Sequence, residues 1–273
     1  MRSSSSSRLD VPPVPVALAL LADGELTLDG RLVESSNNAM VGSVQLDGER
    51  LRCVYKPIRG ERPLWDFPQG RLAEREVAAF LVARAAGWQV APPTVLRQGP
   101  FGTGMVQQWI DGARSDQAAT VFPVGELPAG WLPVMHAVDP EDRPLVVAHA
   151  DTPELAAIAV FDIVANNADR KASHLLVDPA GALYGVDHGL TFHTEPKIRT
   201  ILWGWAGQAI PEMLLSGLRA LAVSLHGALG TELTSYLSTT EVESLAARVR
   251  ALLAEPVFPL PPDDRTPIPW PPL

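Results

Sequence analysis

Short runs of alternating apolar and polar residues fill the first part of the chain. Residues 25–33 alternate about a turn signal at 29–30. Residues 41–46 and 51–55 also alternate, and they flank an Asp-Gly dipeptide at 47–48 that is typical of two-residue hairpins. The pattern predicts three strands, of which the last two form a hairpin.

A helical period replaces this alternation at residues 71–86, where apolar residues recur at helical spacing until Gly87. A further strand is predicted at 105–110. Three strands, a helix and another strand together predict a small, β-rich N-terminal lobe.

The second half of the chain has a different pattern. Residues 123–144 are rich in proline and lack a clean period, which predicts an irregular loop or insertion. Residues 152–166, 211–227 and 239–253 have helical spacing, and Thr152 is the expected N-cap of the first of these helices. A mainly helical C-terminal lobe follows from these periods.

Two acidic residues lie on either side of a short predicted hairpin. Residues 172–177 and 183–186 are expected to pair through a turn at 178–181. The pairing would bring Asp169 and Asp187 to one end of the hairpin. Kinases place a catalytic-loop acid and a metal-binding acid in this order along the chain.

Composition limits the class of protein. The chain has 273 residues, 47% of them hydrophobic, which suits a two-lobed domain with a real core. The single cysteine, Cys53, excludes an intramolecular disulfide, and the net charge of −9 argues against a nucleic-acid partner. The apolar run at 14–22 is far shorter than the ~20 residues of a membrane span. We therefore expect a cytoplasmic protein without stable membrane insertion.

The motifs around the two acids resemble those of a known group of kinases. Asn-Ala-Asp-Arg at 167–170, followed by Val-Asp-His-Gly-Leu-Thr-Phe at 186–192, is similar to the catalytic and metal-binding segments of type II phosphatidylinositol 4-kinases and HipA toxin kinases. The run Lys-Pro-Ile-Arg-Gly-Glu-Arg-Pro-Leu-Trp-Asp-Phe-Pro at 56–68 resembles actinobacterial kinase-like proteins of the phosphatidylinositol 3/4-kinase family. The resemblance extends over about residues 30–211.

The resemblance implies an α+β, atypical protein-kinase-like fold with two lobes. We expect a disordered, serine-rich segment at 1–13, an N-lobe at 14–110, a C-lobe at 111–255 and a proline-rich tail at 256–273. The tail contains eight prolines, which exclude regular structure. Packing of the tail along its own domain is the commoner outcome, and a polyproline ligand for an SH3-like partner is the alternative.

The same resemblance implies roles for individual residues, with ATP and Mg²⁺ or Mn²⁺ as ligands. Asp169 is the implied base, Asp187 the metal ligand and Lys56 the lysine that contacts the nucleotide phosphates. Lys171, two residues after Asp169, is placed to neutralise the transferred phosphate. His174 departs from the family pattern, which usually has Asn at that position.

Further nucleotide-binding candidates follow from the order of the elements. Glu76, at the edge of the apolar face of the predicted helix 71–86, can reach a strand lysine, and Glu74 is the alternative. Gln108 and Trp109 occupy the position of an interlobe hinge whose backbone would pair with adenine. The remaining candidates are small polar residues in the turn where a phosphate-binding loop is expected, namely Ser36, Asn37 and Asn38.

Three histidines, His174, His188 and His193, lie within 20 residues of one another. Their spacing matches no standard zinc motif, and no cysteine accompanies them. His174 as a second metal ligand is favoured over a zinc site, and its nitrogen suits Mn²⁺ better than Mg²⁺. A neutral His174 facing the core, with Asp187 alone on the metal, is the alternative.

Together these features predict transfer of the γ-phosphate of ATP to a hydroxyl group. A protein acceptor, including the chain's own serines at 3–7, is favoured over an inositol lipid, because no segment rich in Lys or Arg would attract an anionic membrane. Two alternatives stay open. The chain could bind nucleotide without transferring phosphate, as pseudokinases do, or transfer another part of ATP such as the adenylyl group.

Overall fold

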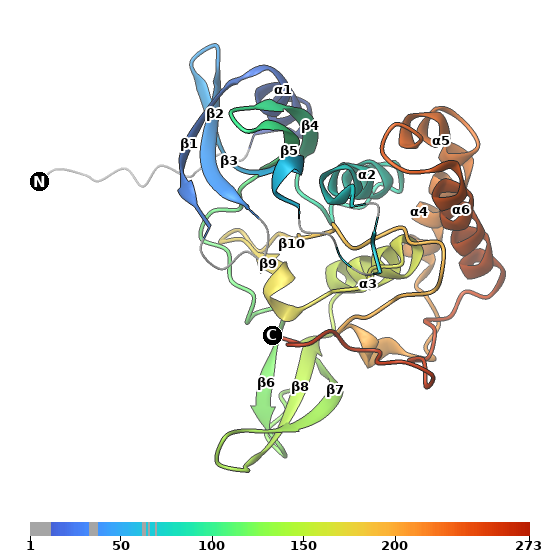
Figure 1. Ribbon diagram of the computed structural model, residues 1–273. Coiled ribbons are helices and arrows are strands. Elements are labelled where there is room, and N and C mark those ends of the chain that lie inside the picture. The colour runs from blue at the N-terminus through green and yellow to red at the C-terminus, as the bar shows by residue number, and fades with distance from the viewer. Residues whose placement is uncertain (1–11, 33–37, 62–63, 65, 69) are drawn as a thin grey trace, which may run out of the picture.

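A computed structural model describes residues 12–32, 38–61, 64, 66–68 and 70–273. A β-rich lobe and a mainly helical lobe lie side by side, and a small separate sheet projects from the helical lobe (Figure 1). The serine tract at 3–7, which we predicted to be disordered, lies outside the described residues.

The N-lobe is built on an antiparallel five-stranded sheet in the order β1-β2-β3-β5-β4. Its strands are β1 (Glu25–Arg31), β2 (Met40–Leu46), β3 (Glu49–Pro57), β4 (Thr94–Gly99) and β5 (Gly102–Gln108). Asp47 and Gly48 both have positive φ and form the predicted β2–β3 turn, which is confirmed.

Two sequence-based predictions for this sheet were wrong. No turn interrupts β1 at 29–30, because the register shift between Leu28 and Gly30 is a bulge within one continuous strand. β4 was not predicted from the sequence; it is an edge strand that pairs with β5.

One helix packs on each face of the sheet. α1 (Val14–Asp23) buries Leu20 and Leu21 in a cluster with Cys53 and Tyr55 of β3. α2 (Leu72–Ala85) is the predicted helix at 71–86, and its residues Ala73 and Val77 cluster with Met105 of β5. Because side chains alternate across a strand, Lys56 lies on the α2 side of the sheet.

The C-lobe is mainly helical. Its helices are α3 (Pro153–Ala165), α4 (Glu212–Leu225), α5 (Ala228–Leu233) and α6 (Thr239–Ala254). The described residues also form three short 3₁₀ helices, η1 (Ile58–Gly60) in the N-lobe and η2 (Ala172–His174) and η3 (Trp203–Trp205) in the C-lobe. The Thr152 side chain accepts a hydrogen bond from the Leu155 amide, which confirms the predicted cap of α3.

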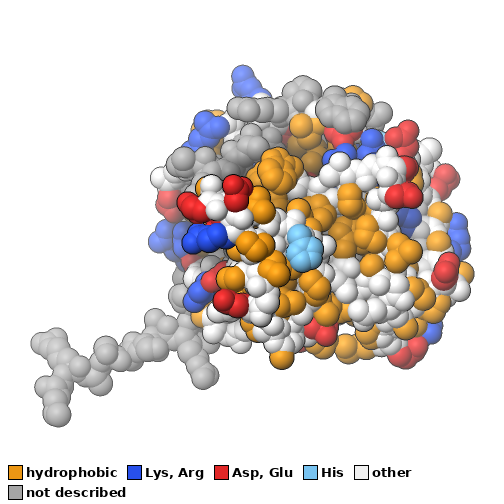
Figure 2. Space-filling model, turned by 90° about the horizontal axis from the view of Figure 1, so that it is seen from below, with side chains coloured by type: hydrophobic (Ala, Val, Ile, Leu, Met, Phe, Trp, Pro, Cys, Tyr) orange, Lys and Arg blue, Asp and Glu red, His pale blue; other side chains and the backbone are white. Residues whose placement is uncertain are grey.

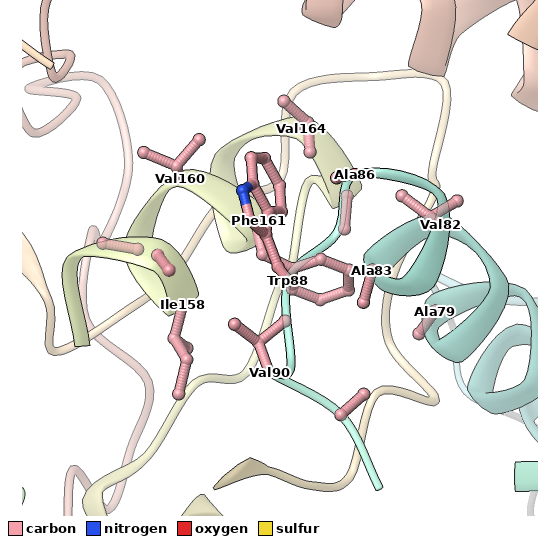
Figure 3. Close-up of a cluster of buried hydrophobic side chains, with 14 of the residues drawn as sticks. Ala79, Val82, Ala83, Ala86, Trp88, Val90, Ile158, Val160, Phe161 and Val164 are labelled. Atoms are coloured by element: carbon pink, nitrogen blue, oxygen red, sulfur yellow. The ribbon is translucent and has the colours of Figure 1, made fainter. Parts of the chain in front are cut away.

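The end of α2 and the segment after it share a continuous core with the C-lobe. Trp88 and Val90, from the segment after α2, lie between Ala83 of α2 and Phe161 of α3 (Figure 3). The segment therefore joins the two lobes by burial as well as by chain connection. α2, which carries Glu76, is held against the C-lobe rather than standing free.

The predicted hairpin that carries the two acids is confirmed in shortened form. Its strands are β9 (Leu175–Val177) and β10 (Leu183–Gly185), and residues 172–174 belong to η2. The hairpin lies between the two lobes in Figure 1, below the five-stranded sheet and beside α3. The acids that flank it are therefore placed at the lobe boundary.

The prediction of an irregular loop at 123–144 was wrong. A three-stranded antiparallel sheet in the order β6-β8-β7 occupies this region, with β6 (Ala119–Pro123), β7 (Trp131–Val138) and β8 (Pro144–Ala150). Pro133 is accommodated because β7 is an edge strand with a bulge between Pro133 and Met135. Seen from below, this end of the molecule exposes many apolar side chains, with charged ones toward the rim (Figure 2).

The tail at 256–273 contains no helix or strand, as its prolines predicted, and it packs along the C-lobe. Among the described residues, no helix combines the length and the apolar character needed to cross a membrane. A β-rich lobe with one helix against its inner face, joined to a helical lobe, confirms the α+β, two-lobed fold.

Candidate active site

Lys56 joins three parts of the fold at one point. Its ammonium group donates to Glu76 Oε1 at 2.7 Å and to Asp187 Oδ1 at 2.8 Å. Glu76 is buried in α2, whereas 44% of the Asp187 side chain is exposed. Glu74, the alternative partner, lies 3.5 Å from Arg71 instead. The structure therefore places Glu76 against the strand lysine.

Lys56 lies between two carboxylates and favours the charged form of each. Burial by itself would lower the pKa of Lys56, but the carboxylates of Asp187 and Glu76 outweigh it and raise that pKa. The Lys56 ammonium holds the pKa of Asp187 well below its usual range. Burial raises the pKa of Glu76, and Lys56 offsets part of that rise. The site thus presents a fixed cation beside an ionised carboxylate.

Asp187 sits in a conformation that few residues adopt. Its φ is 59°, in the left-handed region, where Asp is tolerated better than most residues. The next amide, of His188, donates to Glu76 Oε2 at 2.9 Å. α2 therefore holds both Lys56 and the turn that carries Asp187, through the two oxygens of one carboxylate.

His174 lies next to Asp187. Its Nε2 is 3.6 Å from Asp187 Oδ2, on the side of the carboxylate away from Lys56. Burial lowers the pKa of His174 to about 4, so the imidazole is neutral at pH 7. The buried Nδ1 of His174 has no hydrogen-bond partner. A neutral nitrogen beside an ionised oxygen is a donor pair that fits a divalent cation, and Mn²⁺ better than Mg²⁺.

The other two histidines turn away from this pair. His188 is buried with its ring edge-on to Phe161, at 5.2 Å between ring centroids. His193 packs edge-on against Phe67, and its Nδ1 accepts from the Glu195 amide. Within the described part of the chain, no three His, Cys, Asp or Glu side chains gather as a metal cluster. A zinc site of the kind considered from the sequence is therefore absent from these residues.

Asp169 is held in the loop after α3. Its amide donates to Asn167 Oδ1 at 3.0 Å, and Lys171 Nζ lies 3.3 Å from its carboxylate. Burial raises the pKa of Asp169, while Lys171 acts in the opposite direction. The charge of Asp187 also raises this pKa. The strand pairing that was predicted to bring the two acids to one end of the hairpin is present between β9 and β10.

A buried arginine that sequence reasoning did not assign to the site connects these loops. Arg170 makes two hydrogen bonds of 2.9 Å to Asp162 of α3, and neither side chain is exposed. Its remaining nitrogen donates to Val186 O at 2.9 Å and to His174 O at 3.3 Å. The only feature of the sequence that pointed to this ion pair was Asp162, an acidic residue within the apolar run of α3. Arg170 thereby fixes the spacing between the loops of Asp169 and Asp187.

The predicted hinge residues have limited hydrogen-bonding capacity left. The Gln108 amide donates to Pro93 O, and the Trp109 amide donates to Arg52 O. The Arg52 guanidinium also lies over the Trp109 ring, 5.1 Å from its centroid. A base at this position would therefore meet carbonyl acceptors, and not these two amide donors.

The phosphate-loop candidates are only partly described. Ser36 and Asn37 lie outside the described residues. Asn38 is exposed and lies against Gly60, and it borders a small pocket beside Lys56. The other residues lining this pocket are Pro57, Glu61, Leu72, Ala73, Glu76, Asp187 and Gly189. Lys56, Glu76 and Asp187 therefore face a hollow at the lobe boundary.

Comparison with known proteins places the chain among relatives. No protein-family model matches it. The crystal structure of the Helicobacter pylori proinflammatory kinase CtkA is similar with a TM-score of 0.44 and 11% sequence identity, over 86% of this chain and 94% of that one. Protein Rv2133c of Mycobacterium tuberculosis is 45% identical over 262 residues, which cover 93% of this chain and 94% of that protein. On that similarity, the chain belongs to the family of Protein Rv2133c.

Proposed function

We propose that the chain is an ATP-dependent phosphotransferase that moves the γ-phosphate to an alcohol group. The observation that carries this proposal is the position of Lys56, within 2.8 Å of both Glu76 and Asp187. A strand lysine paired with a helix glutamate, beside an acid that can hold a metal, is the arrangement that phosphoryl transfer by kinases requires. The resemblance of the motifs at 167–170 and 186–192 to lipid and toxin kinases agrees with it.

In this proposal the nucleotide phosphates bind at the hollow beside Lys56. The Lys56 ammonium contacts phosphate oxygens, and Glu76 keeps it in place. Asp187 and His174 would hold Mg²⁺ or Mn²⁺, with phosphate oxygens and water as the other ligands. Such an ion supplies neutralisation of the charge on the phosphates. Asn38 and the carbonyls near Gln108 and Trp109 are further candidates for nucleotide contact.

Asp169 acts at the acceptor. Its carboxylate accepts the proton of the acceptor hydroxyl as the oxygen forms a bond to the γ-phosphorus, and the bond from phosphorus to the departing ADP oxygen breaks. Burial raises the pKa of Asp169, which makes it a stronger base than an exposed aspartate. Lys171, 3.3 Å from the carboxylate, is placed to stabilise charge on the phosphoryl group in transit.

The acceptor we propose is a protein hydroxyl. The net charge of −9 and the lack of a run of basic residues disfavour sustained docking on an anionic membrane, which an inositol-lipid kinase needs. The serines at 3–7 are candidate acceptors within the chain itself. A cytoplasmic location fits both the single cysteine and an ATP-dependent reaction.

A second candidate function is nucleotide binding without transfer. It is favoured by His174, which stands where the related kinases usually have an oxygen ligand. Under this alternative, ATP and metal would still stabilise the protein, and no phosphate would move. The two functions therefore share a binding site and differ in turnover.

Incubation of the purified protein with γ-labelled ATP and either Mg²⁺ or Mn²⁺ tests both candidate functions. We expect label on protein Ser, Thr or Tyr, mapped by mass spectrometry, and its loss in Asp169→Asn. A parallel assay with phosphoinositide vesicles separates the acceptors. Label on lipid alone would contradict the protein acceptor and keep the phosphotransferase. If ATP stabilises the protein but no label is transferred, nucleotide binding without transfer is favoured. Label transferred from α-labelled ATP would show adenylyl transfer.

A further inference from the structure

The proline-rich tail supplies hydrogen-bond acceptors to the loops around Asp169. Residues 256–272 run along the C-lobe, and their carbonyls accept from backbone amides and one indole. The bonds are Ile210 N to Pro256 O, Gly207 N to Phe258 O, Thr200 N to Pro267 O, Trp203 Nε1 to Pro267 O and Ala172 N to Pro272 O, at 2.9–3.0 Å.

The first part of the tail is an anchor. Phe258 is buried, and its ring stacks on Trp205 at 5.8 Å between centroids. The Phe258 amide also donates to Gln208 O, which together with its own carbonyl bond forms a short antiparallel pairing. Residues up to this point are therefore part of the C-lobe core.

The last part of the tail satisfies donors that nothing else reaches. Ala172 is the first residue of η2, so its amide has no acceptor within the helix. It is 3% exposed, and water cannot easily replace Pro272 O. Thr200 is equally buried and depends on Pro267 O in the same way. A buried amide left without a hydrogen-bond partner destabilises the fold.

These two donors belong to segments that hold the catalytic loop. Ala172 lies three residues after Asp169. Thr200 lies between residues that pair with Arg170, since the Arg170 amide donates to Arg199 O and the Ile201 amide donates to Arg170 O. The tail is therefore hydrogen-bonded both to the loop of Asp169 and to the segment 199–201 beside it.

Proline suits this role. A proline carbonyl accepts, while the residue has no N–H that would need a partner of its own. Its restricted φ also lowers the conformational entropy lost when the tail is fixed. The prolines that exclude helix and strand therefore favour an extended segment, and its carbonyls accept hydrogen bonds from N–H groups on the C-lobe.

We infer that residues 264–272 are a positioning strap that holds Asp169 in place for transfer. The effect of this strap on turnover rests on the proposed function. Its effect on the order of the Asp169 loop does not. The strap acts through Ala172 and Thr200, and it touches neither nucleotide nor acceptor. Its removal lowers kcat and leaves nucleotide binding at Lys56 unchanged.

The test uses a chain that ends after Asp263, which keeps the Phe258 anchor. Hydrogen exchange of residues 167–174 is expected to accelerate, and kcat to fall by about 10- to 100-fold with the KM for ATP little changed. A synthetic peptide of residues 264–273, added in trans, restores both, whereas a scrambled peptide does not. The exposed Leu260 offers a matched control, and Leu260→Ser leaves both readouts as in the full chain.

Ala172→Pro supplies a second variant with the tail intact. It removes the amide donor, at a first helical position where proline is accepted, and it reproduces the faster exchange at 167–170. Unchanged exchange at Asp169 and Arg170 in both variants would overturn the strap, as would full turnover without the tail. If the full chain transfers no phosphate, the proposed function fails. The hydrogen-exchange data then decide by themselves whether the strap holds the loop of Asp169.

Discussion

Arg170 and Asp162 form a two-point ion pair in which neither side chain is exposed to solvent. Removal of two charges from water costs several kcal/mol for each ion, and the attraction between them only roughly offsets that cost. The pair is therefore better explained by what else the guanidinium holds, namely the carbonyls of Val186 and His174. A Cβ on Gly185 would lie 3.1 Å from this guanidinium, so glycine makes room for it.

Arg170→Met is expected to destabilise the fold by about 3–5 kcal/mol, because it leaves the Asp162 carboxylate buried without a partner. The double change Arg170→Met with Asp162→Leu should recover much of that loss in urea denaturation, since no unpaired charge remains. Turnover should stay low in the double variant, because the spacing of the two loops is no longer fixed. Arg219→Met, which breaks the exposed pair with Glu212, is the control and should leave the urea midpoint unchanged. If the double variant recovers turnover as well as stability, Arg170 is not needed to position the site.

Asp187→Asn and Lys56→Ala are expected to impair nucleotide handling by different routes. Loss of Asp187 removes the proposed metal ligand, so the stabilisation by ATP should no longer depend on metal. Loss of Lys56 should mainly lower turnover, by weaker alignment of the phosphates. Thermal shift with and without metal, alongside the γ-labelling assay, distinguishes the two. Arg114→Ala, on an exposed pair with Asp116, serves as control. A wild-type protein with no metal-dependent shift by ATP would contradict the assigned nucleotide site.

His174→Asn tests the choice of metal. The wild-type activity should be higher with Mn²⁺ than with Mg²⁺, because the nitrogen of His174 lies beside Asp187 where the kinases with similar motifs usually have Asn. The variant should shift the preference toward Mg²⁺, measured as the ratio of initial rates with each ion. Identical ratios in the two proteins would assign His174 to the core packing of the loop.

His149 predicts a specific dependence of stability on pH. Burial lowers its pKa to about 4, and Asp151 opposes that shift only in part. The neutral ring accepts from the Gly204 amide at Nε2, and its Nδ1 lies 2.9 Å from Ala150 O. The unfolded chain takes up a proton near pH 6.5 and the folded chain does not, so this contribution is present above pH 6.5 and is lost as the pH falls toward 4.

The expected slope is about 1.4 kcal/mol of unfolding free energy for each pH unit in that window. His149→Gln should flatten the curve relative to the wild type, whatever its effect on stability at pH 8. His174 and His188 contribute with the same sign in both proteins, so the difference between the two urea titrations isolates His149. Parallel curves for the two proteins would show that His149 titrates normally in the fold.

Several elements could be predicted because their determinants are adjacent in the sequence. The Asp-Gly turn at 47–48 needs two residues that adopt positive φ, and both stand there. Thr152 followed by a proline defines the start of α3 through a local hydrogen bond and a fixed φ. The hairpin between Asp169 and Asp187 also depends on a short turn, so the closeness of the two acids followed from local pairing.

Other features depend on neighbours that are distant along the chain. The sheet β6-β8-β7 contains prolines that locally disfavour a strand, and it forms because Pro133 falls on an edge with a bulge. Likewise, β4 was not predicted from the sequence, and its strand structure depends on pairing with β5. Propensity is a local quantity, whereas an edge position exists only once the strands have assembled.

The candidate site shows the same division. The sequence by itself determined which residues carry charge and in what order, and so placed Lys56, Glu76, Asp169 and Asp187 among the candidates. Only the tertiary structure decided that Arg170 is buried on Asp162, that the amides of Gln108 and Trp109 are already paired, and that the tail reaches Ala172. Burial and hydrogen-bond partners depend on which segments pack together, and local patterns of residues along the chain do not show which distant segments will meet.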